Sequence, residues 1–220
     1  MEIRRTGNAG ILLNLDDVSI LLDGVCRQVL SYLPTPPEER KKLSSPWPDA
    51  VAFTHIHEDH FDLDYARDYT QATGRPIVST AQAEQQLPQK VWTQEVYTAG
   101  KVTLKAVKTR HMGHWGQTTE HQSFVIEGSR CIWFLGDASP IQMKRLAEER
   151  KPDVLILPYP YVSTPAALKI VEQYLPCKIV LLHLPLKEKD PDGIWQEAES
   201  GLRQLKPYIY VPEVGETIYI

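Results

Sequence analysis

The residues most able to do chemistry in this chain lie together in the segment His55-Ile56-His57-Glu58-Asp59-His60. In an extended turn, residues two apart point the same way, so His55 and His57 can hold one metal together. Asp59 and His60 follow where the chain turns into a helix, which moves them to a neighbouring position. Histidine is the commonest metal ligand, and carboxylates complete zinc sites. A lone exposed histidine is usually ordinary surface, but three histidines and an aspartate within six residues predict a metal site.

Three further residues able to bind metal each follow a short apolar run. They are His111 beyond Leu104–Val107, Asp137 beyond Ile132–Leu135 and His183 after Ile179–Leu182. In sheet proteins with helices on the faces, sites gather at the carboxyl ends of the strands. These side chains are therefore expected to converge with the 55–60 segment at one edge of a sheet.

Asp137 and His183 each have a plainer interpretation. An aspartate at a strand end is often only a turn residue or a helix cap, and a histidine there can belong to the core. Ser139 can cap the next helix equally well, however, and Pro185 breaks the strand just after His183. We therefore expect Asp137 to bridge two cations and His183 to be a ligand.

The segment His111-Met112-Gly113-His114 leaves one assignment open. Both histidines lie just past a strand, and one of them should complete a three-nitrogen set with His55 and His57. His111 is nearer to the strand end, where position is best fixed, so we favour it as the ligand. His114 then has room to face the substrate.

Aromatic residues that follow strands are candidates for substrate contact. Tyr159 and Tyr161 come after the apolar run 154–157, and Trp115 comes after His114. Such rings either contact substrate or cover the edge of the core. We expect Tyr159 and His114 to contact the substrate. Arg110 could meet an anionic substrate, although a lone arginine is usually a solvated charge.

The elements that must position these residues follow from hydrophobic periodicity and from turn and cap residues. We expect strands at 11–15, 18–22, 51–54, 77–78, 101–109, 122–126, 130–135, 154–157, 178–182 and 217–220, and helices at 62–73, 80–87, 140–150, 164–175 and 192–205. Residues 25–48 should form a long loop with a short helix that begins near Pro36 or Pro37. Hairpins followed by βα units, and then the same again, predict one domain over 1–220 with two packed sheets and helices outside.

Composition limits the classes of partner. Of the 220 residues, 42% are hydrophobic, which suffices for a sizeable core, and the net charge is −4. With no basic stripe, the sequence disfavours nucleic acid as a partner and favours a small molecule. No apolar run approaches the ~18 residues that span a bilayer, so no membrane partner is expected. The start Met1–Arg5 is not followed by a signal core, and three distant cysteines do not form a disulfide framework. We expect a cytoplasmic protein, and nothing in the sequence bears on its oligomeric state.

The segment Thr54–His60 resembles the HxHxDH signature of the metallo-β-lactamase superfamily. His111, Gly136-Asp137 and His183 match that family's remaining motifs in order, so the resemblance covers nearly the whole chain. It implies an α/β fold, an αββα sandwich of two mixed β-sheets with helices on the outer faces. It also implies a dinuclear site, usually zinc. By motif position, the first metal would be held by His55, His57 and His111, the second by Asp59, His60 and His183, and Asp137 would bridge them.

The resemblance also implies a mechanism. Two metals about 3.5–4 Å apart can share a hydroxide whose pKa is lowered to about 7. Asp59 would be the catalytic residue, because it can orient that hydroxide and carry a proton. We expect a hydrolase that acts on a small anionic ester, lactone or phosphoester. Zinc is the expected metal, although mixed sites rich in histidine also accept Mn, Fe, Co or Ni.

Three alternatives stay open from the sequence. The same site could serve a small phosphodiesterase or nuclease, or a non-catalytic module that only binds metal. A third is a diiron redox protein, but that branch of the superfamily carries Glu where this chain has His57. The compact layout, with Lys151-Pro152-Asp153 before a buried strand, looks closest to the small cytoplasmic hydrolases that group with ascorbate-6-phosphate lactonases.

Overall fold

In the computed structural model, which describes residues 1–220, two seven-stranded sheets face each other. In spatial order, the first sheet consists of β14 (Thr217–Tyr219), β1 (Glu2–Arg5), β2 (Ile11–Leu15), β3 (Val18–Leu22), β4 (Ala50–Ala52), β5 (Ile77–Val78) and β6 (Val91–Trp92). The second consists of β13 (Ile209–Tyr210), β12 (Lys178–Leu182), β11 (Val154–Pro158), β10 (Cys131–Phe134), β9 (Glu120–Glu127), β8 (Val102–Arg110) and β7 (Val96–Ala99). Both sheets are mixed, with antiparallel pairs in one half and parallel pairs in the other.

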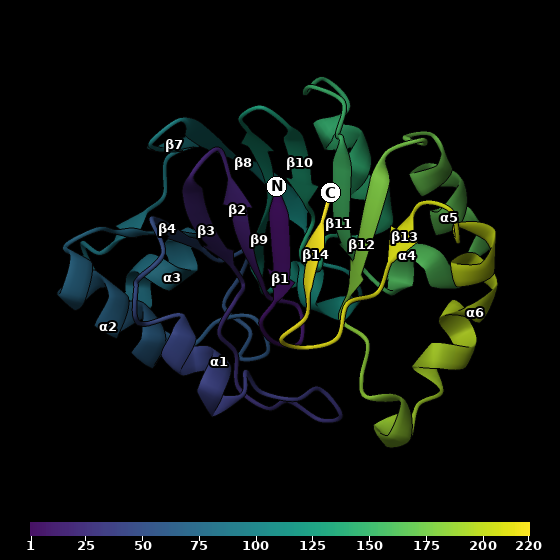
Figure 1. The fold of residues 1–220 in the computed structure, drawn as a ribbon, viewed down its shortest axis with the longest axis horizontal. Helices are drawn as coiled ribbons and strands as arrows, with labels where there is room; N and C mark the ends of the chain where they lie inside the picture. The colour runs from purple at the N-terminus through teal and green to yellow at the C-terminus, as the bar shows by residue number, and fades with distance from the viewer.

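Helices cover the two outer faces. Beside the first sheet lie α1 (Pro37–Lys42), α2 (Leu63–Thr73) and α3 (Ala81–Gln86); beside the second lie α4 (Pro160–Ser163), α5 (Pro165–Glu172) and α6 (Ile194–Gln204) (Figure 1). Three 3₁₀ helices complete the structure, η1 (His114–Gln117), η2 (Pro140–Leu146) and η3 (Lys187–Lys189). The αββα sandwich expected from the resemblance is confirmed. None of the helices is long and apolar enough to cross a membrane.

Alternation along the strands divides the core into layers. In β12, Val180 and Leu182 point between the sheets, whereas Ile179 and Leu181 point toward the outer helices. Because a strand in this position is buried on both faces, it reads as a continuous apolar run rather than an alternating one. The core between the sheets contains buried residues from both of them, including Ile20 and Phe124. The two sheets are therefore held in a fixed relation by one packed layer.

Capping residues predict where helices begin and end, whereas short strands leave little signal in the sequence. Helix α2 begins after Asp62, whose carboxylate accepts a hydrogen bond from Tyr65 N, and ends at Gly74 in the left-handed conformation. The helix expected at 140–150 is wrong in type and length, since η2 is a 3₁₀ helix that ends at Leu146. Strands β1, β6, β7 and β13 were not expected, because they are short and alternate over few residues.

Candidate metal centre

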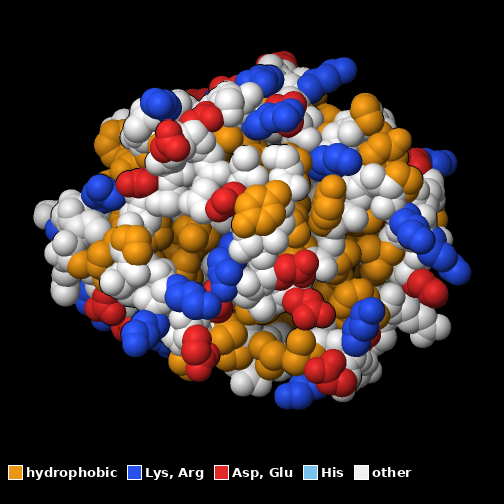
Figure 2. Space-filling view, in the orientation of Figure 1, with side chains coloured by type: hydrophobic (Ala, Val, Ile, Leu, Met, Phe, Trp, Pro, Cys, Tyr) orange, Lys and Arg blue, Asp and Glu red, His pale blue; other side chains and the backbone are white.

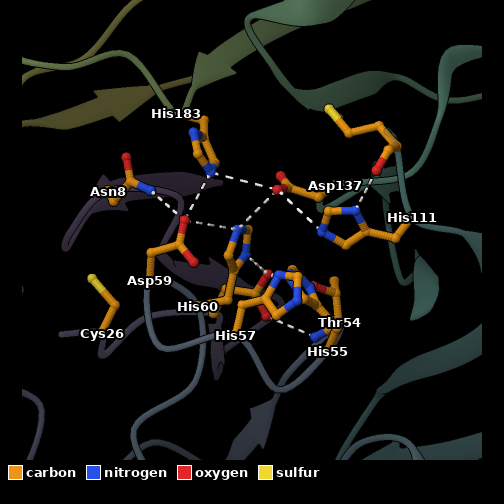
Figure 3. A network of polar contacts seen from close by, with 12 residues as sticks. Asn8, Cys26, Thr54, His55, His57, Asp59, His60, His111, Asp137 and His183 are labelled. Carbon is orange, nitrogen blue, oxygen red and sulfur yellow. Dashed lines mark hydrogen bonds and ion pairs between the residues drawn. The ribbon is translucent and has the colours of Figure 1, made fainter. Parts of the chain in front are cut away.

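All seven expected ligands meet at one edge of the sandwich, just beyond the ends of four strands (Figure 3). Residues 55–60 follow β4, and His111 directly follows β8. Asp137 lies in the turn after β10, and His183 directly follows β12. The first sheet therefore contributes the 55–60 segment, and the second contributes the other three residues.

The donor atoms form three overlapping groups, of which one, Asp23, His55 and His60, lies beneath the other two, hereafter the two donor groups. His55, His57 and His111 each offer one atom within 4.8 Å of the others, and so do Asp59, His60 and His183. Within the first group, His55 Nε2 lies 3.1 Å from His57 Nδ1. These are the same two sets that the motif positions imply.

Asp137 lies between the groups. Its Oδ2 atom is 3.6 Å from His111 Nε2 in the first group. The same oxygen is 3.4 Å from His60 Nε2 and 3.6 Å from His183 Nε2 in the second. One carboxylate oxygen thus faces a histidine nitrogen of each set.

Three of the five histidine rings in the two donor groups are oriented by hydrogen bonds from Nδ1, whereas His57 contacts Thr119 Oγ1 through Nε2 at 3.0 Å. His55 Nδ1 donates to Thr54 Oγ1 at 2.9 Å, His60 Nδ1 donates to Asp23 Oδ2 at 2.8 Å, and His111 Nδ1 donates to Met112 O at 2.7 Å. Fixing one ring nitrogen in this way leaves Nε2 as the free lone pair, as is usual for metal-binding histidines.

The free atoms fit a bound cation. His60 Nε2, His111 Nε2, His183 Nε2 and Asp137 Oδ1 are buried and make no hydrogen bond of normal geometry. His183 Nε2 does lie 3.2 Å from Asp59 Oδ2, but only as a close charge contact. Buried polar atoms are nearly always paired. Nitrogen and carboxylate donors that converge without partners are the set expected around divalent metal.

Burial keeps three of the histidines neutral. It lowers the pKa of His55 well below its usual value, and the nearby His60 lowers it further. Burial also lowers the pKa of His57 and of His111. A histidine must be neutral to bind metal. At neutral pH these side chains are therefore ready to act as ligands.

Asp59 of the second group and Asp137 between the groups both stay charged. Burial alone would raise the pKa of Asp59, but His183 and His60 outweigh it and lower that pKa to about 2. The pKa of Asp137 is held well below its usual value, because His183 and His60 again outweigh burial. Burial lowers the pKa of His60, but Asp137, Asp23 and Asp59 outweigh burial and raise it well above its usual value, so a metal bound at His60 Nε2 would displace a proton. This part of the site is a negative pocket that favours a cation.

Sequence reasoning missed Asp23, which supports the centre from beneath. Its side chain is fully buried and accepts hydrogen bonds from Thr54 N and Thr54 Oγ1, both at 2.7 Å, as well as from His60 Nδ1. In the sequence, Asp23 directly follows the strand expected at 18–22, and its type and position there indicate only the end of a hairpin. The usable signal is that β3 and β4 are parallel neighbours, so residues just beyond their ends meet.

His121 was also missed. Its ring is buried, with its centroid 5.1 Å from that of His55, and its Nδ1 donates to Thr109 Oγ1 at 2.7 Å. His121 Nε2 has no hydrogen-bond partner. It lies inside β9 opposite Thr109 of β8 rather than after an apolar run. Only the register of that hairpin places it near the cluster.

The expected substrate-contact residues lie around the centre at different depths. His114 is exposed in η1, with its ring 4.5 Å from that of Trp115 and outside both donor groups. Trp115 in turn lies 5.3 Å from the His57 ring. Tyr159 is half-buried, 6.5 Å from the His183 ring. These three rings therefore flank the two donor groups.

Three smaller expectations have mixed outcomes. Tyr161 is not a substrate contact, since it is fully buried and donates a hydrogen bond to Ala138 O at 2.9 Å. Ser139 stands at the N-cap position of η2, but its hydroxyl makes no capping hydrogen bond. Arg110 is exposed at the end of β8.

Comparison with known proteins identifies a sequence family. The model of the β-lactamase superfamily domain matches residues 2–181. A UPF0173 metal-dependent hydrolase from Pyrobaculum islandicum is 31% identical over 238 residues, which cover 100% of both chains. The domain match covers six of the seven expected ligands and ends just before His183, and the match to the relative spans all seven.

Solved structures share the fold. A possible metal-dependent hydrolase from Veillonella parvula superposes with a TM-score of 0.78 at 17% identity, over 100% of this chain and 99% of the other. Isothiocyanate hydrolase from Delia radicum gut bacteria superposes with a TM-score of 0.73 at 14% identity, over 100% and 99%. At such low identities the likeness establishes the architecture.

Proposed function

Because this chain belongs to the β-lactamase superfamily and is a metal-dependent hydrolase, we propose that it hydrolyses a small anionic ester, lactone or phosphoester at a centre of two divalent cations. The observation that carries the proposal is the position of Asp137. Its Oδ2 atom lies 3.4–3.6 Å from histidine nitrogens of both donor groups. A carboxylate in that position suits two neighbouring cations better than one.

The donor sets support one assignment of the ligands. His55, His57 and His111 would hold one cation, Asp59, His60 and His183 the other, and Asp137 both. Zinc is our choice for such a mixed nitrogen and oxygen set, with Mn, Fe or Ni as other candidates. When bound, two such cations supply a hydroxide nucleophile near neutral pH and polarise the attacked oxygen.

Asp59 would carry the proton in the reaction. Asn8 Nδ2 donates to its Oδ2 atom at 3.4 Å, and His183 Nε2 lies 3.2 Å from the same oxygen. Because its pKa is lowered to about 2, mainly by His183 and His60 acting against burial, Asp59 is ionised at neutral pH. It can therefore accept a proton from the attacking water and later pass it to the leaving group.

The surroundings guide the choice of substrate. Two cations in a pocket attract an anionic group, and His114 and Tyr159 flank that pocket as candidate contacts. Positive and negative side chains are interspersed over the face seen in Figure 2. With a net charge of −4 as well, a small molecule is a better candidate than nucleic acid. The lactonase-like subgroup and the cytoplasmic location stay predictions from the sequence.

The test combines metal analysis with a substrate screen. Purified protein is reconstituted with zinc, its metal content is measured, and esters, lactones and phosphodiesters are screened with and without chelator. We expect two metals per chain and turnover that chelator abolishes. Asp59→Asn, which is nearly isosteric, should lower turnover by about 10²–10⁴-fold. Turnover of phosphodiesters alone would favour a phosphodiesterase, and two bound metals without any turnover would favour a binding module.

A further inference from the structure

Three of the six large apolar side chains that remain exposed lie on loops that carry or adjoin the expected ligands. Leu30, Trp115 and Leu186 are 86%, 49% and 38% exposed. Trp115 lies four residues after His111, and Leu186 three residues after His183. Leu30 lies on the loop that follows Asp23. Three separate loops beside the centre therefore each present an apolar side chain to solvent.

The loop that carries Leu30 is built as a closed unit, here called the 26–35 loop. Its neck is closed by hydrogen bonds from Thr35 N to Cys26 O and from Cys26 N to Thr35 Oγ1, both at 3.1 Å. Arg27 fastens one side to the centre's own segment, because its backbone N donates to Glu58 O at 2.7 Å. At the tip, Val29 and Tyr32 exchange backbone hydrogen bonds around Leu30 and Ser31.

Leu30 is unfavourable for folding in two respects. It has a φ of 51°, in the left-handed region that side chains other than glycine, asparagine and aspartate seldom adopt. It is also 86% exposed, so it buries little apolar surface in return. Backbone strain of this kind tends to occur at ligand-binding positions. An exposed leucine held at the tip of an anchored loop suits a ligand better than the core.

Aromatic rings connect this loop to the ligands themselves. The Tyr32 ring lies edge-on to His183 with 4.3 Å between centroids. In the other donor group, His57 has the Trp115 ring edge-on at 5.3 Å between centroids. Two nearby cations are already engaged, since Arg27 pairs with three carboxylates and Lys187 lies over the Trp195 ring. Arg110, which lies against Gly116 next to Trp115, is exposed and makes no ion pair. The surroundings thus offer apolar contact from the two rings beside one free positive charge.

We propose that Leu30, Tyr32 and Trp115 form a subsite that binds an aromatic or branched apolar group of the substrate while the hydrolysed group lies at the metals. The inference rests on the proposed function and specifies its substrate class as an anionic head joined to an apolar group. A lipid surface or a second copy of the chain fits less well, because Tyr32 and Trp115 each contact an expected metal ligand, one in each donor group.

The test compares two phosphonates that share a head group. Methylphosphonate and benzylphosphonate are titrated calorimetrically into zinc-loaded protein. Burying a phenyl-sized group is worth roughly 10- to 100-fold in affinity. Benzylphosphonate should therefore bind at least about 10-fold more tightly than methylphosphonate. Equal affinities would overturn the subsite and leave the proposed function standing. If neither phosphonate bound, the proposed function and the subsite would fail together.

Two variants locate the apolar group. Leu30→Asn keeps a residue that tolerates the left-handed backbone, so the fold should be unchanged. Leu30→Asn and Trp115→Ala should each weaken benzylphosphonate several-fold and leave methylphosphonate and zinc content unaltered. Val96→Asn is the matched control, an exposed apolar residue on β7. If both variants kept the wild-type ratio of affinities but lost self-association or binding to phosphatidylcholine vesicles, these side chains would be a docking surface and the subsite would be wrong.

Discussion

At the scale of single residues, Asp137 links the two donor groups through one oxygen atom. Asp137→Ala should therefore reduce zinc content below one metal per chain rather than remove one metal cleanly. Elemental analysis after dialysis against a fixed free zinc concentration would measure this, with the exposed Glu148→Ala as control. A variant that still held two metals would show that Asp137 does not bridge.

His111 and His114 make a second test at this scale. Only His111 belongs to a donor group, and its Nδ1 is fixed by Met112 O, whereas His114 is exposed. His111→Ala should lose a metal, and His114→Ala should keep both and alter KM. Zinc titration of the two variants side by side decides the matter, because the opposite result would mean that the assignments are reversed.

His121 gives the metal-free protein a pH dependence. Burial lowers its pKa to about 3, while an unfolded histidine takes up its proton near pH 6.5. Its pKa is thus depressed in the folded state, so stability is lost as pH falls below about 6.5, by up to about 1.4 kcal/mol per pH unit. His55, His57 and His111 act in the same direction. His60 acts oppositely, because its raised pKa stabilises the fold below pH 6.5 and that contribution is lost on going up through the folded value.

Because the contribution of His60 no longer changes much below pH 6.5, the four histidines with lowered pKa set the slope, and metal-free protein should become less stable from pH 6.5 down to pH 4.5. Urea unfolding at several pH values would measure the slope, and His121→Gln should reduce it. A stability that stays level or rises on acidification would contradict the assignment of neutral histidines.

At the scale of elements, Arg5 at the end of β1 holds several loops together. It is 7% exposed, and its guanidinium donates to the carbonyl oxygens of Gly7, Asn8, Leu184 and Pro212 at 2.9–3.1 Å. Burial lowers its pKa to about 10, so it remains charged at neutral pH. It thereby fixes Asn8, which contacts Asp59, and the residue after His183.

Arg5→Met should leave four carbonyl groups without their donor. We expect a loss of about 2–4 kcal/mol in the free energy of unfolding, together with weaker binding of the metal held by Asp59 and His183. Denaturant unfolding of metal-free protein and zinc titration would separate the two effects. Arg203→Met, at an exposed position of α6, is the control. Unchanged metal affinity in Arg5→Met would restrict the residue to a role in stability.

Elements set by local chemistry could be predicted, and those set by distant pairing could not. The first hairpin follows from its turn, because Asp16 and Asp17 both adopt the positive φ that a two-residue turn requires. The ligands at strand ends followed from apolar runs in the same way. Asp23 and His121 depend instead on the pairing of β3 with β4 and of β8 with β9. That information is absent from any short segment of the chain.

At the scale of the whole molecule, the two sheets repeat one plan. Each has antiparallel strands followed by parallel ones, as the order of hairpins and βα units predicted. The metal centre takes residues 55–60 from the first sheet and His111, Asp137 and His183 from the second. Neither sheet alone supplies a complete donor group with its bridge.

The layer of side chains between the sheets consequently sets the distance between the ligands that the two sheets carry. If that layer is made thinner, the sheets move relative to each other, and the distances between the donor atoms at their edge change. Val102 belongs to this layer and Val171 to the layer beneath the outer helices, and both are fully buried. Val102→Ala and Val171→Ala should cost similar stability, about 1–2 kcal/mol each, but only Val102→Ala should weaken zinc binding. Equal zinc affinities would mean that the ligand loops, and not the distance between the sheets, set the geometry of the centre.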